Sequence, residues 1–247
     1  MGAGTMSGLC GIGSRIVEKG GESWLEVTSP EPLYVLNSSL WGGGFGWRTG
    51  LVNRQVDKSY SCDDPGAEME CFLTRNGYEP DRTAGLLTAA RVQDGGYASA
   101  SLQVEEGGRA DRLEVRTWVT VGLSNKARAG LPQLEDNLFP GTINIIVLLD
   151  GQPTEAAMVN AVITATEAKA AVLQDLNIRL ESGEGATGTT TDAVLIAATG
   201  GGRKLSYAGT ATRLGYLIGR TVYEATKASA LHYLRYIEER AGSGFRS

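Results

Sequence analysis

Lys169 is the residue whose position most strongly suggests chemistry. We predict a long helix over about 155–176, capped by Thr154. At 100° per residue, its apolar stripe consists of Met158, Val162, Ala165, Val172 and Leu176. Lys169 falls in the middle of that stripe, where a lysine reaches the surface, pairs with a carboxylate or is desolvated at a cost in free energy. Buried charges concentrate at functional sites. We therefore hold two interpretations open, a stem lying on a sheet and a functional ammonium paired with Asp192.

The loop before Asp192 is the second candidate. Residues 185–191 contain four threonines and two glycines, and such a loop can direct backbone N–H groups and hydroxyls at an oxyanion or an amide. A tight turn before a strand is the simpler interpretation. The loop is no Walker sequence, because GxxxxGK[ST] occurs nowhere in the chain. Glu167 points to a different helix face from Lys169, and its position alone favours a solvated charge over a catalytic one.

Other polar or aromatic segments could line a site. The glycine-rich loop 38–47 is either a plain turn or a place where a large flat ligand lies against Trp41, Phe45 and Trp47. Thr142 and Asn144 share one face of a predicted strand by the period of two.

Composition excludes several mechanisms. His232 is the single histidine among 247 residues, so a His-rich zinc site is impossible and a Ser-His-Asp triad would have to use this residue. Cys10, Cys62 and Cys71 are odd in number and fit no metal-ligand spacing, which favours free thiols in a reducing compartment. The net charge of −5 disfavours a large nucleic-acid surface. We expect no protein-bound metal.

Nothing in the sequence predicts a membrane protein. The most apolar run, Ile143–Leu149, is far below the roughly 20 residues that a crossing helix needs. The first residues lack the basic start and apolar stretch of a signal peptide. We expect a soluble cytoplasmic protein with no nucleic-acid and no membrane partner. The oligomeric state stays open, with a homodimer as one option.

The elements predict an α+β fold. Helices are expected from Asp64 to Gly77, over 155–176 and over 212–240. Strands are expected near 15–19, 23–28, 33–38, 85–92, 97–104, 112–123, 141–149 and 192–198, with a hairpin turn at 105–108. We assign residues 1–14 to a flexible N-terminal tail and 15–247 to a single domain, a mixed β-sheet with the long helices packed on it. Strand order is not predicted.

Several fragments carry a resemblance to a known family. They are NSS at 37–39, GGG at 42–44, GLLTAA at 85–90, VTVGLSN at 119–125, GTINI at 141–145, ATEAK at 165–169, ATGTTTDAV at 186–194 and YAGT at 207–210. In this order and spacing, the sequence resembles the adenosylcobinamide amidohydrolases from about residue 30 to 230. One departure is visible: Thr190 stands where the resemblance leads us to expect glycine, and it adds bulk and limits positive φ.

The resemblance implies a role in corrinoid salvage. Family members hydrolyse the amide that joins the aminopropanol arm to the corrin ring, giving adenosylcobyric acid. The corrinoid brings its own cobalt, so no protein-bound cofactor is implied. The candidate catalytic residues are Lys169, Asp192 and Glu167. The candidate substrate-binding residues are Ser38, Ser39, Gly43, Thr88, Asn125, Thr142, Asn144, Thr187 and Thr189.

Two schemes for amide hydrolysis stay open. In one, Asp192 or Glu167 activates water while Lys169 and loop N–H groups hold the oxyanion. In the other, a threonine or serine hydroxyl attacks, with Lys169 as the base. Rival hypotheses are a corrinoid- or tetrapyrrole-binding protein without catalysis and an amidase of the same fold acting on an unrelated amide.

Overall fold

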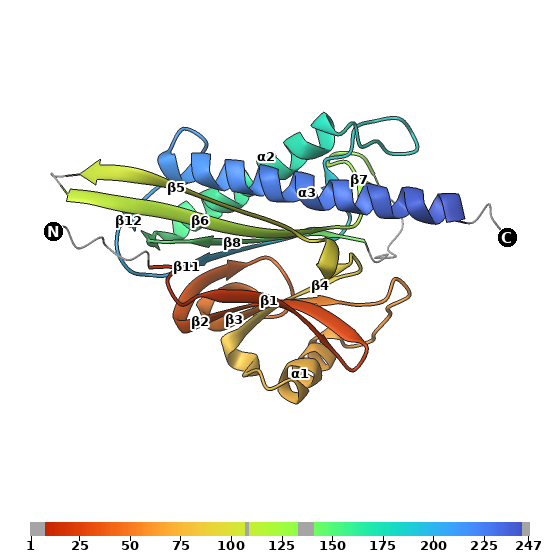
Figure 1. Cartoon of the computed structure of the whole chain (residues 1–247), viewed down its shortest axis with the longest axis horizontal. Helices are drawn as coiled ribbons and strands as arrows, with labels where there is room; N and C mark the ends of the chain where they lie inside the picture. Colours follow the sequence, from red (N-terminus) through yellow and green to blue (C-terminus); the bar gives the residue numbers. More distant parts are fainter. Residues whose placement is uncertain (1–7, 107–108, 133–140, 244–247) are drawn as a thin grey trace.

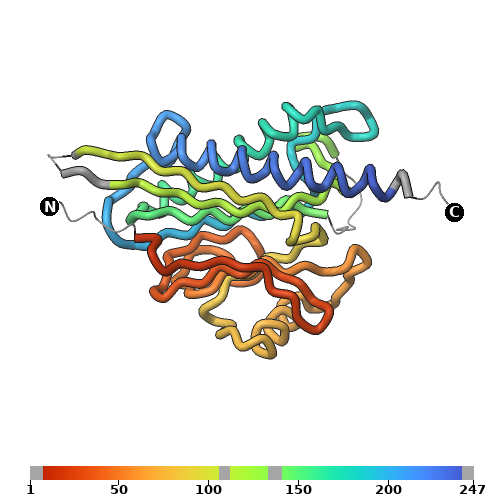
Figure 2. Tube along the Cα trace, in the orientation of Figure 1, coloured from red at the N-terminus to blue at the C-terminus, as the bar shows by residue number. Residues whose placement is uncertain are grey.

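The computed structural model describes residues 8–106, 109–132 and 141–243, and these residues form four stacked layers (Figures 1 and 2). The long helices α2 (Glu155–Asp175) and α3 (Arg213–Ser243) cover one face of a folded sheet. The sheet itself supplies two layers, and the short helix α1 (Pro65–Arg75) lies beneath the second of them. The predicted α+β class, a mixed sheet with long helices packed on it, is confirmed.

The main sheet has eight strands. They are β1 (Gly13–Lys19), β2 (Glu22–Asn37), β3 (Gly44–Gln55), β4 (Thr83–Thr88), β5 (Gly96–Glu106), β6 (Arg109–Val121), β8 (Ile143–Leu149) and β11 (Ala193–Ala198). Their order is β4-β3-β2-β11-β8-β6-β5, with β1 paired to β2. The pairs β3–β4 and β8–β11 are parallel and the others are antiparallel, so the sheet is mixed.

The long strand β2 joins the two sheet layers. Its register with β3 shifts between Thr28 and Leu33, and only its last part also pairs with β11. Beyond that junction, β1–β4 form one layer and β5, β6, β8 and β11 form the other (Figure 1). The ends of β4 and β8 consequently lie close together although they are distant in the strand order.

The two faces of β8 pack against different layers. All seven residues of β8 are buried. Ile143, Ile145 and Val147 pack with residues of α2 and α3, whereas Ile146 and Leu148 pack between the two sheet layers. Asn144 is the polar exception on the sheet-to-sheet face. This run, apolar on both faces, is the central strand that the sequence predicts.

The helices begin at the predicted caps. Thr154 Oγ1 accepts a hydrogen bond from Ala157 N at 3.1 Å, and Asp64 Oδ1 accepts one from Ala67 N at 2.9 Å. Four two-residue strands connect loops by pairing outside the main sheet. They are β7 (Lys126–Ala127) with β10 (Gly188–Thr189), and β9 (Gln152–Pro153) with β12 (Lys204–Leu205). Two 3-10 turns span Pro80–Arg82 and Val92–Asp94.

The structure corrects two local expectations. The glycine-rich loop 38–47 is shorter than expected, because residues from Gly44 onward extend as β3 and pair with the end of β2. The tail that we assign to residues 1–14 also ends earlier than expected. Leu9 is fully buried between the sheet layers and Gly13 already belongs to β1. Of the predicted hairpin turn at 105–108, residues 107–108 lie outside the described residues.

Among the described residues, α2 is the one helix long and apolar enough to cross a membrane by length and composition. Within the apolar window of α2, 44% is buried inside the protein, and the helix packs on the sheet and against α3 (Figure 1). These contacts are typical of a core helix.

Candidate active site

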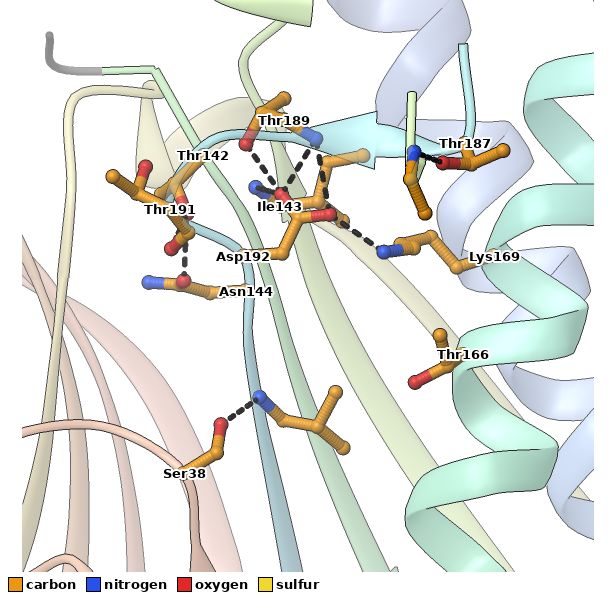
Figure 3. Close-up of polar contacts among 12 residues, drawn as sticks. Ser38, Thr142, Ile143, Asn144, Thr166, Lys169, Thr187, Thr189, Thr191 and Asp192 are labelled. Atoms are coloured by element: carbon orange, nitrogen blue, oxygen red, sulfur yellow. Dashed lines mark hydrogen bonds and ion pairs between the residues drawn. The ribbon is translucent and has the colours of Figure 1, made fainter. Parts of the chain in front are cut away.

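The predicted pairing of Lys169 with Asp192 is confirmed. Lys169 Nζ lies 2.6 Å from Asp192 Oδ2, and the two side chains are 8% and 14% exposed. The long helix α2 carries Lys169 on its inner face, and Asp192 is the last residue before β11 (Figure 3). The lysine therefore does not snorkel to the surface; it forms an ion pair within the protein.

Asp192 is surrounded by donors as well as by this ammonium. Its carboxylate accepts hydrogen bonds from Ile143 N at 3.0 Å and from Thr189 N at 3.1 Å (Figure 3). The Thr189 hydroxyl also donates to Oδ1, in a short contact. A hydroxyl, a carboxylate and an ammonium thus form a continuous chain of contacts.

Gly188 lets the loop close over the ion pair. A Cβ at this position would lie 2.3 Å from Asp192 Oδ2 and 2.8 Å from Lys169 Nζ. Only a residue without a side chain fits there. By contrast, Thr190 is accommodated: its hydroxyl accepts a hydrogen bond from Asn125 Nδ2 at 2.6 Å, and its φ is not positive. The departure from the expected glycine at Thr190 therefore introduces no backbone strain.

A cavity of about 340 Å³ lies on the other side of the same loop. Its lining includes Thr88, Thr142 and Thr191, together with Tyr60 and Cys62. Thr142 Oγ1 donates to Thr191 O at 2.7 Å, which closes the wall between β8 and the threonine loop. Since Thr191 directly precedes Asp192, the cavity lining and the ion pair are adjacent along the chain.

Two buried asparagine side chains form hydrogen bonds beneath this wall. Asn144 Nδ2 donates to Asn53 Oδ1 and to Leu87 O, both at 2.8 Å, and Asn53 Nδ2 donates to Thr120 Oγ1 at 2.9 Å. These side chains are almost fully buried, so Asn144 lies beneath the site and does not line it. Its bonds tie β8 to β3 and β4, and its Oδ1 lies 3.2 Å from Thr142 Oγ1.

A wall of the cavity is fixed by an ion-pair network. Tyr60 donates to Glu68 at 2.8 Å, and Glu68 receives two hydrogen bonds from Arg54, at 2.7 and 2.8 Å. Burial, together with the bond to Glu68, raises the pKa of Tyr60. The Arg54 hydrogen bonds lower the pKa of Glu68 against the opposing effect of burial. Tyr60 therefore stays a neutral hydroxyl group with a charged partner behind it.

Several predicted residues lie elsewhere. Glu167 is exposed on the outer side of α2 in a groove beside α3, so it takes no part in the Lys169 cluster. Its helical offset of two residues from Lys169 already turns it away. Thr187 Oγ1 accepts from Ala129 N at 2.9 Å and, with Asn125, fastens the segment after β6 to the threonine loop.

The turn after β2 is also remote from the ion pair. Ser38 Oγ accepts from Val194 N at 2.9 Å, and Figure 3 places Ser38 well apart from Asp192. Ser39 donates to Gly85 O and receives a hydrogen bond from Asn37 at 2.8 Å. Gly43 faces Ser39 O, which a Cβ would meet at 2.5 Å. The three predicted residues Ser38, Ser39 and Gly43 close this turn and line none of the cavities described here.

A second cavity, of about 470 Å³, adjoins the first and shares Val56, Tyr60 and Ala89 with it. Sequence reasoning singled out neither Tyr60 nor Thr191 individually. Thr191 lay within the threonine loop, so its neighbourhood carried a signal, whereas Tyr60 sits in a loop without a recognisable motif.

The arrangement around Asp192 suits acyl transfer. A nucleophile, a base and a group that orients the base must lie within hydrogen-bond reach of one another. Thr189, Asp192 and Lys169 meet that condition in this order. The backbone N–H of Thr189 contacts the carboxylate in the same cluster. A hydroxyl beside a carboxylate, with a cation behind it, can attack a carbonyl carbon.

The family model and two curated relatives give the same family description. The model of the adenosylcobinamide amidohydrolase family matches residues 12–237. The chain is 31% identical over 187 residues to an adenosylcobinamide amidohydrolase from Methanosarcina mazei, covering 72% of this chain and 80% of that protein. It is 32% identical over 213 residues to one from Halobacterium salinarum, covering 83% of each. A solved structure, the PH0078 protein from Pyrococcus horikoshii, matches with a TM-score of 0.44 at 12% identity over 90% of this chain and 83% of that one.

Proposed function

The chain belongs to the adenosylcobinamide amidohydrolase family, and on that premise we propose that it hydrolyses adenosylcobinamide at the cluster of Thr189, Asp192 and Lys169. The observation that carries this site is the continuous contact of hydroxyl, carboxylate and ammonium. The bond cleaved joins the aminopropanol arm to the corrin ring. The products are adenosylcobyric acid and the free amine.

The first half of the reaction transfers the acyl group to the protein. The Thr189 oxygen attacks the amide carbon while its proton passes to Asp192, which it already contacts. The C–N bond then breaks, and the leaving amine takes from Asp192 Oδ1 the proton that Thr189 gave up. Lys169 stays protonated against Oδ2, 2.6 Å away, and orients the carboxylate. The net proton movement is from the Thr189 hydroxyl to the amine.

The second half restores the hydroxyl. Water attacks the ester on Thr189, gives one proton to Asp192 and forms the carboxylic acid as the C–O bond breaks. Asp192 returns the proton to the Thr189 oxygen. Of the two schemes left open by the sequence, this one follows the hydroxyl route but makes Asp192 the base, because Thr189 contacts Asp192 and Lys169 serves to orient that carboxylate.

The neighbouring cavity supports the same proposal. We place part of the corrinoid there, because the lining includes threonine side chains and Thr191, the residue next to Asp192. The cobalt belongs to the substrate, so no protein-bound cofactor enters the scheme. The three free cysteines support a cytoplasmic location.

The test combines product analysis with two substitutions. Purified protein and adenosylcobinamide are incubated, and cobyric acid and aminopropanol are followed by mass spectrometry. Thr189→Val removes the hydroxyl and should reduce turnover by at least about 1,000-fold, whereas Thr189→Ser should retain part of it. Thr166→Val, on the exposed face of α2, is the matched control and should leave turnover unchanged.

Trapping distinguishes the hydroxyl route from direct attack by water. With hydroxylamine present, an acyl-enzyme on Thr189 yields the hydroxamate of the corrinoid as well as the acid. Turnover by a folded Thr189→Val protein without hydroxamate would overturn Thr189 as nucleophile. Binding of the corrinoid without any turnover by the parent protein would favour the non-catalytic binding protein instead.

A further inference from the structure

The second cavity has a wall of mixed aromatic and charged character. It lies between the last turns of α3 and the segment that follows β3. On α3, the Tyr236 ring is flanked by two guanidinium groups: the Arg91 Cζ lies 5.0 Å and the Arg240 Cζ 5.6 Å from the ring centroid. Arg240 Nη1 also donates to the Tyr236 hydroxyl at 2.9 Å. Tyr236, Arg91 and Arg240 all line the cavity.

Carboxylates line the cavity together with this ring and these guanidinium groups. Asp94 lies 3.4 Å from Arg91 Nη1 and keeps 26% of its side chain exposed, and Asp57 lines the same cavity. Asp57 is held by the backbone N and hydroxyl of Ser59, which lower its pKa and keep it ionised. The wall therefore presents both cationic planes and anionic acceptors.

This combination fits a nucleoside better than a phosphate. A base stacks on tyrosine rings and guanidinium planes, and a carboxylate accepts hydrogen bonds from ribose hydroxyls. Lys58 and Arg240 also line the cavity, but a phosphate would meet the carboxylates of Asp94 and Asp57 as like charges, and Arg91 is already partnered by Asp94.

Size and continuity connect this cavity to the reaction. Drug-sized ligands occupy pockets of about 300–1,000 Å³, and a corrinoid that carries a nucleoside exceeds that size class. The cavity next to Asp192, of about 340 Å³, cannot hold it alone. The two cavities share Val56, Tyr60 and Ala89 in their walls, so they adjoin at this segment.

We propose that the adenosyl group of the substrate binds in the second cavity against Tyr236 and Arg91, with its ribose hydroxyls on Asp94. This inference rests on the proposed function, since that function supplies the substrate. The corrin ring then spans the shared wall, and the aminopropanol arm reaches Thr189. The second cavity makes the enzyme selective for corrinoids that carry the nucleoside.

Product binding tests this without any turnover. The affinities of adenosylcobyric acid and of dicyanocobyric acid, which has cyanide in place of the nucleoside, are measured by calorimetry. Tyr236→Leu should weaken the binding of adenosylcobyric acid about tenfold, the scale of one lost base stack, and leave dicyanocobyric acid unaffected. Asp94→Asn should act in the same direction. Tyr216→Leu, a half-exposed tyrosine of α3 in the groove beside α2, is the control and should change neither affinity.

The outcomes separate the two proposals. Equal weakening of both ligands by Tyr236→Leu, or no weakening of either, overturns the adenosyl site whatever the catalytic assay gives. Selective weakening supports it even if Thr189 proves not to be the nucleophile. Melting curves of each variant confirm that the fold is retained, and Tyr236→Phe provides a second variant that keeps the ring and should retain most of the affinity.

Discussion

Replacing Lys169 by methionine removes the ammonium that contacts Asp192 and keeps an unbranched stem on the buried face of α2. After the change, Asp192 still accepts hydrogen bonds from Ile143 N and from the N–H and hydroxyl of Thr189. The carboxylate therefore keeps its position but loses the cation that orients and neutralises it. Both stability and turnover should respond, for different reasons.

The stability change follows from an uncompensated charge. Breaking a buried ion pair by removing one partner costs about 3–5 kcal/mol. Because Asp192 is 14% exposed and keeps its other donors, we expect about 3 kcal/mol, the lower end. Turnover should fall about 100-fold or more, the scale of losing one preorganised electrostatic group.

The assay measures kcat with adenosylcobinamide and the free energy of unfolding in urea. The double variant Lys169→Met/Asp192→Asn removes the stranded charge, so it should recover much of the stability and none of the turnover. Glu167→Gln, on the exposed side of the same helix, should change neither quantity. A folded Lys169→Met protein with parental kcat would refute the role assigned to Lys169.

Three further predictions follow from the contacts around the site. Gly188→Ala should abolish turnover because its Cβ would lie 2.3 Å from Asp192 Oδ2, whereas Gly209→Ala, whose Cβ meets nothing within 4 Å, should retain parental kcat; normal activity of the first variant would contradict this geometry. The Arg54 hydrogen bonds lower the pKa of Glu68, so the stability that this carboxylate adds is present above its ordinary value of 4.5 and is lost as the pH falls below it. Urea unfolding from pH 6 to about 3 should therefore show a steeper loss for the parent than for Glu68→Gln, and parallel curves would be evidence against it. Turnover should survive dialysis against EDTA, since the sequence has one histidine and no cysteine pair at ligand spacing; activity lost to EDTA and restored by zinc would reverse that expectation.

The Lys169–Asp192 pair could be predicted because its signals are local. A lysine within the apolar stripe of a long helix needs a partner, and an aspartate at the start of a buried strand supplies one. The helix caps at Thr154 and Asp64 were predictable for the same reason, since a capping side chain bonds within its own first turn.

The residues that line the cavities could not be predicted from such local signals. Asn53 meets Asn144 only because the sheet folds over at β2, and no local pattern encodes that bend. Tyr60 lines both cavities through an ion-pair network in which Arg54 lies on β3 and Glu68 on α1. Such contacts depend on which layers face each other.

Ser38, Ser39 and Gly43 show how ambiguous residue type can be. Small polar residues and glycines can bind a ligand or build a tight turn, and both uses demand the same residue types. In the structure, the Ser38 hydroxyl accepts a hydrogen bond from Val194 N and the Ser39 hydroxyl donates one to Gly85 O of β4. The sequence could not predict these partners, because they lie on strands that are distant along the chain.

The fold-over of β2 also constrains the order in which the chain can assemble. Asn37 at the end of β2 pairs with Leu195 of β11, and the core between the sheet layers needs Ile146 and Leu195 from late in the chain. During synthesis the N-terminal strands therefore emerge from the ribosome well before the residues that cover them. Pairings so distant in sequence slow folding and leave apolar strands exposed meanwhile. Fragments that end before β11 should accordingly aggregate, and the described layers should be completed only after the C-terminal half has been made.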